Sequence, residues 1–260
     1  MNFTDLMPNL KKKNVDLESE ITEDYYEKDY NAKNPTIPIT IEGTDYELKT
    51  EQYENLMQIL EKTGTRIEEI KEYANKHEFK ICFGIKIEKE AITGLQITNY
   101  ELTAMPEEIT QLTALEDLSL RGNKISTIPA TITRLTALKY LSLCNNQIRT
   151  MPTPITQLTK LQTLYLGHNK LSTLPDSITQ LINMQYLDLQ FNYLSALPDN
   201  FGQLTNMQKL DLSYNKLSSL PDSFAQLTNL QTLNLTYNKL KTLPEKIQKI
   251  LKQKGVNIYT

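Results

Sequence analysis

Histidine and cysteine, the side chains that most often serve as catalytic bases, nucleophiles and metal ligands, are scarce in this chain. His77 and His168 are its two histidines, and Cys82 and Cys144 its two cysteines, among 260 residues. They are too far apart in sequence to give a readable histidine triad or the ligand spacing of a zinc site. The glycines are isolated, so no phosphate-binding loop is present. The sequence therefore predicts a protein that is not an enzyme and needs no metal or other cofactor.

The composition narrows the class of partner. The chain has 28 Lys+Arg against 31 Asp+Glu and a net charge of −3, so it lacks the basic surplus that nucleic-acid binding requires. Its apolar runs fall short of the ~18 residues that span a bilayer, and the N-terminus lacks the charge and apolar pattern of a signal peptide. Two cysteines fit a reducing compartment. We therefore expect a cytoplasmic-type protein that neither binds nucleic acid nor inserts into a membrane.

Charge is distributed unevenly along the chain. Residues 1–91 carry 13 basic and 20 acidic side chains, whereas residues 92–260 carry 15 basic and 11 acidic ones. The most acidic stretch, residues 16–29, has few apolar residues and so cannot bury enough surface to fold by itself. We expect residues 1–33 to be a flexible acidic segment in front of two differently built regions.

A repeat of 23 residues organises the second region. The unit that begins at Leu115 reads Leu-x-x-Leu-x-Leu-x-x-Asn-x-Ile-x-x-Ile-Pro, and units in the same phase begin at 138, 161, 184, 207 and 230. An imperfect unit begins at Ile92, with Tyr100 in place of the asparagine. The asparagines of the complete units are Asn123, Asn146, Asn169, Asn192, Asn215 and Asn238.

The pattern itself predicts a stacked structure. The fourth and sixth positions of each unit are spaced as in a strand, so both leucines point to one face, and the asparagine comes where the chain turns away. Asparagine side chains stacked from unit to unit can pair with backbone groups that the turn leaves unpaired. One unit cannot bury enough apolar surface to fold alone, so neighbouring units must stack into a solenoid.

This unit resembles the leucine-rich repeat, and its length and Leu-Pro step are similar to the intracellular, Ras-group type. The resemblance covers residues 92–260 and implies an α/β fold, a horseshoe solenoid with a parallel β-sheet on its concave face. Near-identical units with many lysines, asparagines and isoleucines are also similar to the leucine-rich repeat effectors that bacteria such as Legionella inject into host cells.

Both ends of such a solenoid need covers. Residues 34–91 predict a small α+β N-terminal cap: a hairpin over 37–48, a helix from about residue 51 to Gly64, a second helix from residue 65, and a strand over 79–87. Whether this unit is only a cap or also an interaction module stays open. After the repeats of residues 92–244, residues 245–260 predict a capping helix that ends at Gly255 and a closing strand.

The positions between and beside the strand leucines face the concave side and differ from unit to unit. Cys144 holds one of these positions and is expected to expose its thiol, whereas Cys82 lies in an apolar strand and is expected to be inert. Aromatic residues exposed on a rigid sheet are typical of protein interfaces. The candidate partner-binding residues are Arg121, Tyr140, Tyr165, His168, Tyr186, Asp188, Gln190, Phe191, Lys209 and Asp211.

The favoured function is therefore non-enzymatic binding of a protein partner on the concave face. The resemblance to bacterial effectors implies delivery into a host cell by a dedicated secretion system. It also implies a host protein as the partner, one of the ubiquitin or small-GTPase machinery. Two alternatives stay open: a substrate-recognition adaptor in a ubiquitin-ligase assembly, and a surface or adhesion protein.

Overall fold

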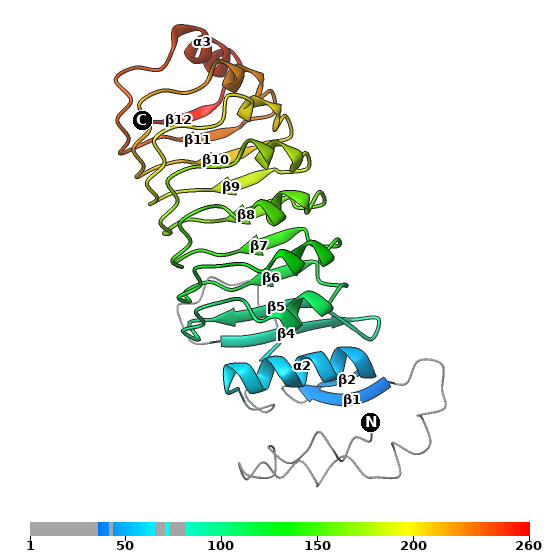
Figure 1. Cartoon of the computed structure of the whole chain (residues 1–260). Helices are drawn as coiled ribbons and strands as arrows, with labels where there is room; N and C mark the ends of the chain where they lie inside the picture. Colours follow the sequence, from blue (N-terminus) through cyan, green and yellow to red (C-terminus); the bar gives the residue numbers. More distant parts are fainter. Residues whose placement is uncertain (1–35, 42–43, 66–70, 73–81) are drawn as a thin grey trace, which may run out of the picture.

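The molecule is an elongated solenoid in which strands stack along its length (Figure 1). The computed structural model describes residues 36–41, 44–65, 71–72 and 82–260. The order of the ten-stranded sheet is β12-β11-β10-β9-β8-β7-β6-β5-β4-β3, so strands that follow each other in sequence pair with each other. A two-stranded sheet and helix α2 lie at the N-terminal end, and helix α3 lies at the C-terminal end.

The strands of the repeats are parallel and in register, one from each unit. Leu118 pairs with Leu141, and Leu141 pairs with Leu164, so equivalent positions of successive units form columns. This geometry confirms the predicted solenoid with a parallel sheet. The strands are β5 (Ala91–Thr98), β6 (Asp117–Ser119), β7 (Tyr140–Ser142), β8 (Thr163–Tyr165), β9 (Tyr186–Asp188), β10 (Lys209–Asp211), β11 (Thr232–Asn234) and β12 (Asn257–Tyr259).

Short 3-10 helices form the layer opposite the sheet (Figure 1). A proline opens these turns: it has no N–H to leave unpaired, and its carbonyl accepts the first hydrogen bond, as Pro129 does from the Ile132 N–H at 3.1 Å. Ile132 is fully buried, and burying such a side chain contributes about 1.5–3 kcal/mol. The helices are η5 (Glu107–Gln111), η6 (Ala130–Arg134), η7 (Thr153–Gln157), η8 (Asp176–Gln180), η9 (Phe201–Gln203) and η10 (Asp222–Gln226).

Two neighbouring units have phenylalanine where the earlier units bury isoleucine in this layer. Phe201 and Phe224 are fully buried and stack with 6.2 Å between ring centroids. Gly202 stands where the four preceding units have threonine, and its N–H donates to Ser223 Oγ at 3.0 Å. A Cβ at Gly202 would overlap the backbone carbonyl of Ser223. The missing side chain therefore lets η9 and η10 approach closely beside the two rings.

We expect Gly202→Ala to destabilise the fold by about 1–3 kcal/mol, because the added methyl group forces apart two packed backbones. Thr133→Ala is the matched control, since it changes the same position of an earlier unit and removes one exposed hydrogen bond to the Ala130 carbonyl. Urea unfolding followed by circular dichroism measures both variants. Equal unfolding midpoints would contradict the close approach of η9 and η10.

The N-terminal cap contains the predicted hairpin and the first predicted helix. β1 (Thr36–Ile41) and β2 (Thr44–Lys49) are antiparallel, and α2 (Thr50–Thr63) follows β2 directly. Gly64 ends α2 with a φ of 68°, a left-handed conformation that glycine adopts at little cost. The strand pattern, the apolar period of the helix and the glycine stop therefore predict the first part of the cap correctly.

The cap is joined to the solenoid on both faces. β4 (Cys82–Glu88) runs antiparallel to β5, which confirms the predicted strand from residue 82 on; residues 79–81 lie outside the described residues. On the helical side, α2 packs against η5, where Lys62 Nζ lies 2.6 Å from Glu108 Oε1. The cap thus covers core side chains that the first unit would otherwise expose.

The prediction of a second helix in the cap is wrong for the two residues of it that the structure describes. Residues Lys71–Glu72 form a short strand, β3, which pairs in parallel with β4 at the edge of the large sheet. Pairing with β4 outweighs the local signal of a capping box there. The rest of the expected helix, with Ile67, Ile70 and Ala74, lies outside the described residues, as does the acidic segment 1–33.

The C-terminal end has the predicted helix and strand. α3 (Glu245–Gln253) buries Ile247 and Leu251 and packs against η10. Gly255 follows with a φ of 66°, and β12 then pairs in parallel with β11. This helix and strand close the apolar core at its far end.

Candidate functional site

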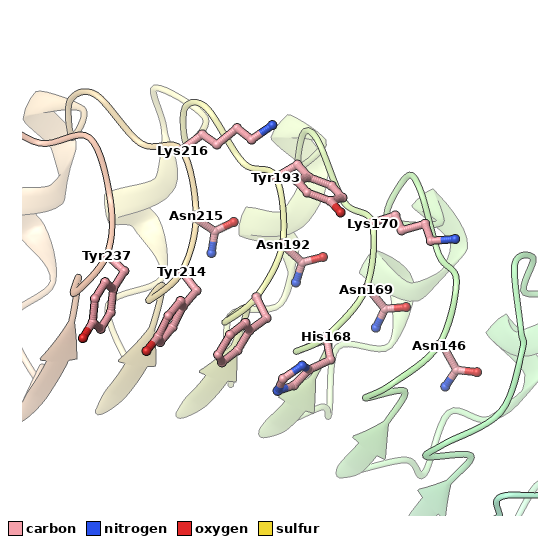
Figure 2. Close-up of a pocket in the computed structure, with 11 residues that line it drawn as sticks. Asn146, His168, Asn169, Lys170, Asn192, Tyr193, Tyr214, Asn215, Lys216 and Tyr237 are labelled. Carbon is pink, nitrogen blue, oxygen red and sulfur yellow. The ribbon is translucent and has the colours of Figure 1, made fainter.

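The asparagines of the repeats form a hydrogen-bonded ladder at the turns that follow the strands (Figure 2). Asn169 shows the pattern. Its Nδ2 donates to the carbonyls of Leu143, Leu166 and Gly167 at 2.9, 3.0 and 3.3 Å. Its Oδ1 accepts the N–H of Ile148, in the preceding unit, at 3.0 Å. Each ladder residue thus joins two units through backbone groups that the turn would leave unpaired.

Three tyrosines meet at the centre of the concave face. Tyr140 lies on β7, Tyr165 on β8 and Tyr186 on β9. The ring centroids of Tyr140 and Tyr165 are 5.5 Å apart, and those of Tyr165 and Tyr186 are 4.9 Å apart with the rings edge to face at 78°. All three side chains are half-buried. These three residues are called the tyrosine cluster below.

The surroundings keep the hydroxyl groups of the tyrosine cluster protonated. Burial raises the pKa of each hydroxyl above its ordinary value of 10.0, and the nearby Asp188 carboxylate raises the pKa values of Tyr165 and Tyr186 further. At neutral pH the cluster therefore offers three hydroxyls that both donate and accept hydrogen bonds, on rings that bury a large area at low entropic cost.

A buried carboxylate lies beside the tyrosine cluster. Asp188 is only 3% exposed, and its Oδ1 accepts the Gln190 N–H at 3.0 Å. Its Oδ2 accepts hydrogen bonds from Gln190 Nε2 at 3.2 Å and from the Cys144 thiol at 3.8 Å. A Cβ on Gly167 would lie 2.9 Å from this oxygen, so glycine leaves the room that the carboxylate occupies. Burial raises the pKa of the Asp188 carboxyl, and the hydrogen bonds from Gln190 offset part of that effect.

The prediction of an exposed Cys144 thiol is wrong. Cys144 is 8% exposed, because its short side chain lies below the larger residues around it and donates to Asp188 from two units further on. Burial, and then the Asp188 carboxylate, raise the pKa of the thiol to about 12. A thiol with this pKa is a poor nucleophile at neutral pH.

The titration of Asp188 gives a prediction about pH. Because the native pKa lies above 3.8, the folded protein holds this proton more tightly than the unfolded chain does. The contribution of Asp188 to stability is thus greatest below 3.8 and is lost as the pH rises through the native pKa. Asp188→Asn removes this titration; it also changes the hydrogen bonds from Gln190 and Cys144, but that effect is the same at every pH. We expect the wild type to gain stability relative to Asp188→Asn as the pH falls, measured by urea unfolding at several pH values; a difference that shrinks or stays constant would contradict this assignment.

The charged candidates flank the tyrosine cluster along the same face. Asp211 Oδ1 accepts from the Ser213 N–H and hydroxyl at 2.9 and 2.6 Å, and its Oδ2 accepts from Asn234 Nδ2 at 3.1 Å. Lys209 is exposed on the same strand, β10. Arg121 is half-buried in the β6 unit, on the other side of the cluster. The predicted residues therefore share a face without forming a single cluster.

His168 and Phe191 belong to a second feature, at the edge of the concave face. With Tyr214 and Tyr237 they stack in a row through four consecutive units (Figure 2), with centroid distances of 4.2, 3.9 and 4.3 Å. All four have φ between 50° and 58°, a left-handed conformation that bulky residues rarely adopt. We call them the aromatic row.

Tyr214 and Tyr237 are absent from the predicted binding residues, because tyrosine before the ladder asparagine is an ordinary filler in leucine-rich repeats. A signal for the row was nevertheless present. Four consecutive units carry an aromatic ring at one position, and parallel strands ~4.8 Å apart bring such rings within stacking distance.

Metal-binding and membrane-spanning elements are not found in the described parts of the chain. These parts contain no group of three or more histidine, cysteine, aspartate or glutamate residues that could hold a metal ion. Within the same ranges, no helix combines the length and the apolar character that crossing a bilayer requires.

Three leucine-rich repeat families match the repeat region. The family described as "Leucine-rich repeat region" matches residues 131–213, "Leucine Rich repeats (2 copies)" matches residues 205–248, and "Leucine rich repeat" matches residues 91–148. Together with the solenoid geometry, these matches show that the chain is a leucine-rich repeat protein. No protein of curated function matches the sequence.

Solved structures with the same fold come from bacteria and plants. The Leptospira interrogans protein LIC12759 is 33% identical, with a TM-score of 0.56 over 70% of this chain and 54% of that one. The internalin InlF of Listeria monocytogenes is 25% identical, with a TM-score of 0.52 over 60% of this chain and 44% of that one. The ectodomain of the Arabidopsis thaliana receptor kinase GASSHO1/SCHENGEN3 shares the fold at 23% identity and a TM-score of 0.58, over 67% of this chain and 22% of that one. The chain thus spans about half the length of the two bacterial structures.

Proposed function

We propose that this protein is a non-enzymatic binding module that holds a protein partner on its concave face. The tyrosine cluster is the observation that carries the proposal. Its three rings contact one another across three adjacent strands and stay open to solvent on one side. Aromatic anchors of this kind supply much of the binding energy at protein interfaces.

The surroundings of the cluster support the same role. The strands beneath it are held in place, because their leucines are fully buried and ladder asparagines pair with backbone groups at the neighbouring turns. A rigid surface loses little entropy when it binds. The seven repeat strands, at ~4.8 Å spacing, make a face about 29 Å wide, which accommodates the ~800 Å² per partner of a standard interface.

Capture of the partner tests the proposal. Crosslinked pull-downs from a cell lysate, identified by mass spectrometry, compare the wild type with the Tyr140→Ala/Tyr165→Ala/Tyr186→Ala variant. Ile182→Ala, which truncates an exposed side chain away from the cluster, is the control for loss of apolar surface. A protein captured by the wild type and the control but not by the triple variant supports concave binding. Equal capture by all three proteins contradicts it.

The likeness to proteins of Leptospira and Listeria supports a more specific version of the proposal. In this version the protein is a bacterial effector that acts inside a host cell, and its partner is a host protein of the ubiquitin or small-GTPase machinery. Parallel captures from a eukaryotic and a bacterial lysate test it. A partner that depends on the tyrosine cluster and comes only from the bacterial lysate would contradict the effector role while leaving the binding role intact.

A further inference from the structure

The aromatic row borders a shallow groove along the edge of the solenoid, which we call the ladder groove (Figure 2). Its volume is about 570 Å³. The aromatic row lies on one side of it, Lys170, Tyr193 and Lys216 lie on the other, and the ladder asparagines lie between them. Phe191, Tyr193, Tyr214 and Tyr237 are 39–71% exposed, so much of the exposed apolar surface of the described residues gathers at this groove.

Lys170 and Lys216 line the ladder groove, and among the described residues no aspartate or glutamate lines it. The four segments that form this edge contain four lysines and no aspartate or glutamate, although the whole chain has a net charge of −3. The lysines are Lys170, Lys216, Lys239 and Lys241, and the segments are 167–173, 190–196, 213–219 and 236–242. The ion pairs between described residues use other lysines, and Lys216 Nζ lies over the Tyr193 ring, 4.7 Å from its centroid. Such a strip favours an anionic ligand.

The backbone of the aromatic row is strained in a way that the first units avoid. The equivalent positions there are Asn99, Gly122 and Asn145, which share the left-handed φ and are residue types that adopt it readily. The next four units place bulky rings on the same conformation. The row therefore presents four aromatic rings at positions where the first units have small or polar residues.

We propose that the ladder groove binds an extended acidic peptide segment of the protein partner; this inference rests on the proposed function and adds the chemistry of the partner. The lysines attract carboxylates. The rings of the row cover one another's faces, so a ligand beside the row meets ring edges, which carry positive potential. The four units span ~14 Å, about four or five extended residues. A single-stranded nucleic acid fits less well, since its bases stack on free ring faces.

Fluorescence anisotropy with a labelled oligoglutamate peptide of about ten residues, long enough to cross the groove, tests the proposal. The first variant combines Lys170→Glu, Lys216→Glu and Lys239→Glu. The control reverses the same number of exposed lysines elsewhere, with Lys160→Glu, Lys246→Glu and Lys249→Glu. We expect the groove variant to bind the peptide at least about tenfold more weakly than the wild type at low salt, and the control to change affinity by less than about threefold.

A second variant addresses the aromatic row without threatening the fold. Phe191→Asn/Tyr214→Asn restores the residue type that Asn145 uses in the same left-handed conformation, and we expect it to fold and to weaken peptide binding. Equal affinities for the groove variant and the control would overturn the proposal, as would tighter binding of an oligothymidine than of the peptide. The tyrosine cluster is intact in all these variants. If the groove variant no longer binds the peptide but still captures the partner as the wild type does, the groove does not hold a segment of that partner. That result would overturn this inference and leave the proposed function intact.

Discussion

Asn192→Ala is expected to lower the free energy of unfolding by about 3–5 kcal/mol, because it leaves several buried backbone groups without partners. Asn192 is 4% exposed. Its Nδ2 donates to the carbonyls of Leu166, Leu189 and Gln190 at 3.0, 3.1 and 3.2 Å. Its Oδ1 accepts the Leu171 N–H at 2.9 Å. Alanine supplies none of these bonds, and the site has little access to water.

The matched control for Asn192→Ala is Asn206→Ala. Asn206 makes one exposed hydrogen bond, to the Ile182 carbonyl at 2.8 Å, so its loss is expected to cost less than about 1 kcal/mol. Urea unfolding monitored by circular dichroism compares both variants with the wild type. Because units of a solenoid unfold partly independently, the slope of the transition is compared as well as its midpoint. Similar losses in the two variants would show that the ladder does not hold the units together.

Tyr165→Ala and Tyr186→Ala are each expected to weaken binding of the captured partner by about 2 kcal/mol or more, roughly thirtyfold in affinity. Each truncation removes a ring that contacts its neighbour across the strands, but it leaves the core leucines of β8 and β9 in place. The circular dichroism spectrum is therefore expected to stay unchanged. Calorimetric titration of purified proteins measures the affinity.

Two further variants test whether the loss of affinity comes from the ring or from the hydroxyl, and whether it is specific to the tyrosine cluster. Tyr165→Phe keeps the ring and removes only the hydroxyl, so we expect a smaller loss than for alanine. Tyr259→Ala truncates a more exposed tyrosine ring on β12, at the far edge of the sheet, and is expected to leave the affinity unchanged. A loss for Tyr259→Ala as large as that for Tyr165→Ala would place the interface elsewhere on the face.

Most of the fold could be predicted because one local pattern repeats. The leucines, asparagines and prolines of each unit determine the strand, the turn and the convex helix, and a constant period of 23 residues makes every unit pair with the next. The N-terminal cap lacks such redundancy. At Lys71–Glu72 a capping-box signal competes with strand pairing that comes from β4, a tertiary contact that local sequence does not encode.

The candidate site could be predicted in outline only. The period puts Tyr140, Tyr165 and Tyr186 on one face. It does not predict how exposed each side chain on that face is, because exposure depends on the size of the neighbouring side chains and on their contacts. Cys144 shows the difference: its position predicts exposure, yet Asp188, 44 residues later, contacts its thiol. Predicting the aromatic row also requires the spacing of adjacent strands, because that spacing brings aromatic residues at the same position of successive units within stacking distance.

The central claim, that a protein partner lies on the concave face at the tyrosine cluster, is tested most directly by site-specific photocrosslinking. Thr163 pairs with Tyr140 on one side and Tyr186 on the other, so a benzophenone amino acid at position 163 reports on the cluster without removing its rings. The same crosslinker at position 157, exposed on convex helix η7, is the control. A crosslinked protein at position 163 and none at position 157 is the predicted result. A crosslink at position 157 with none at position 163 would contradict the account.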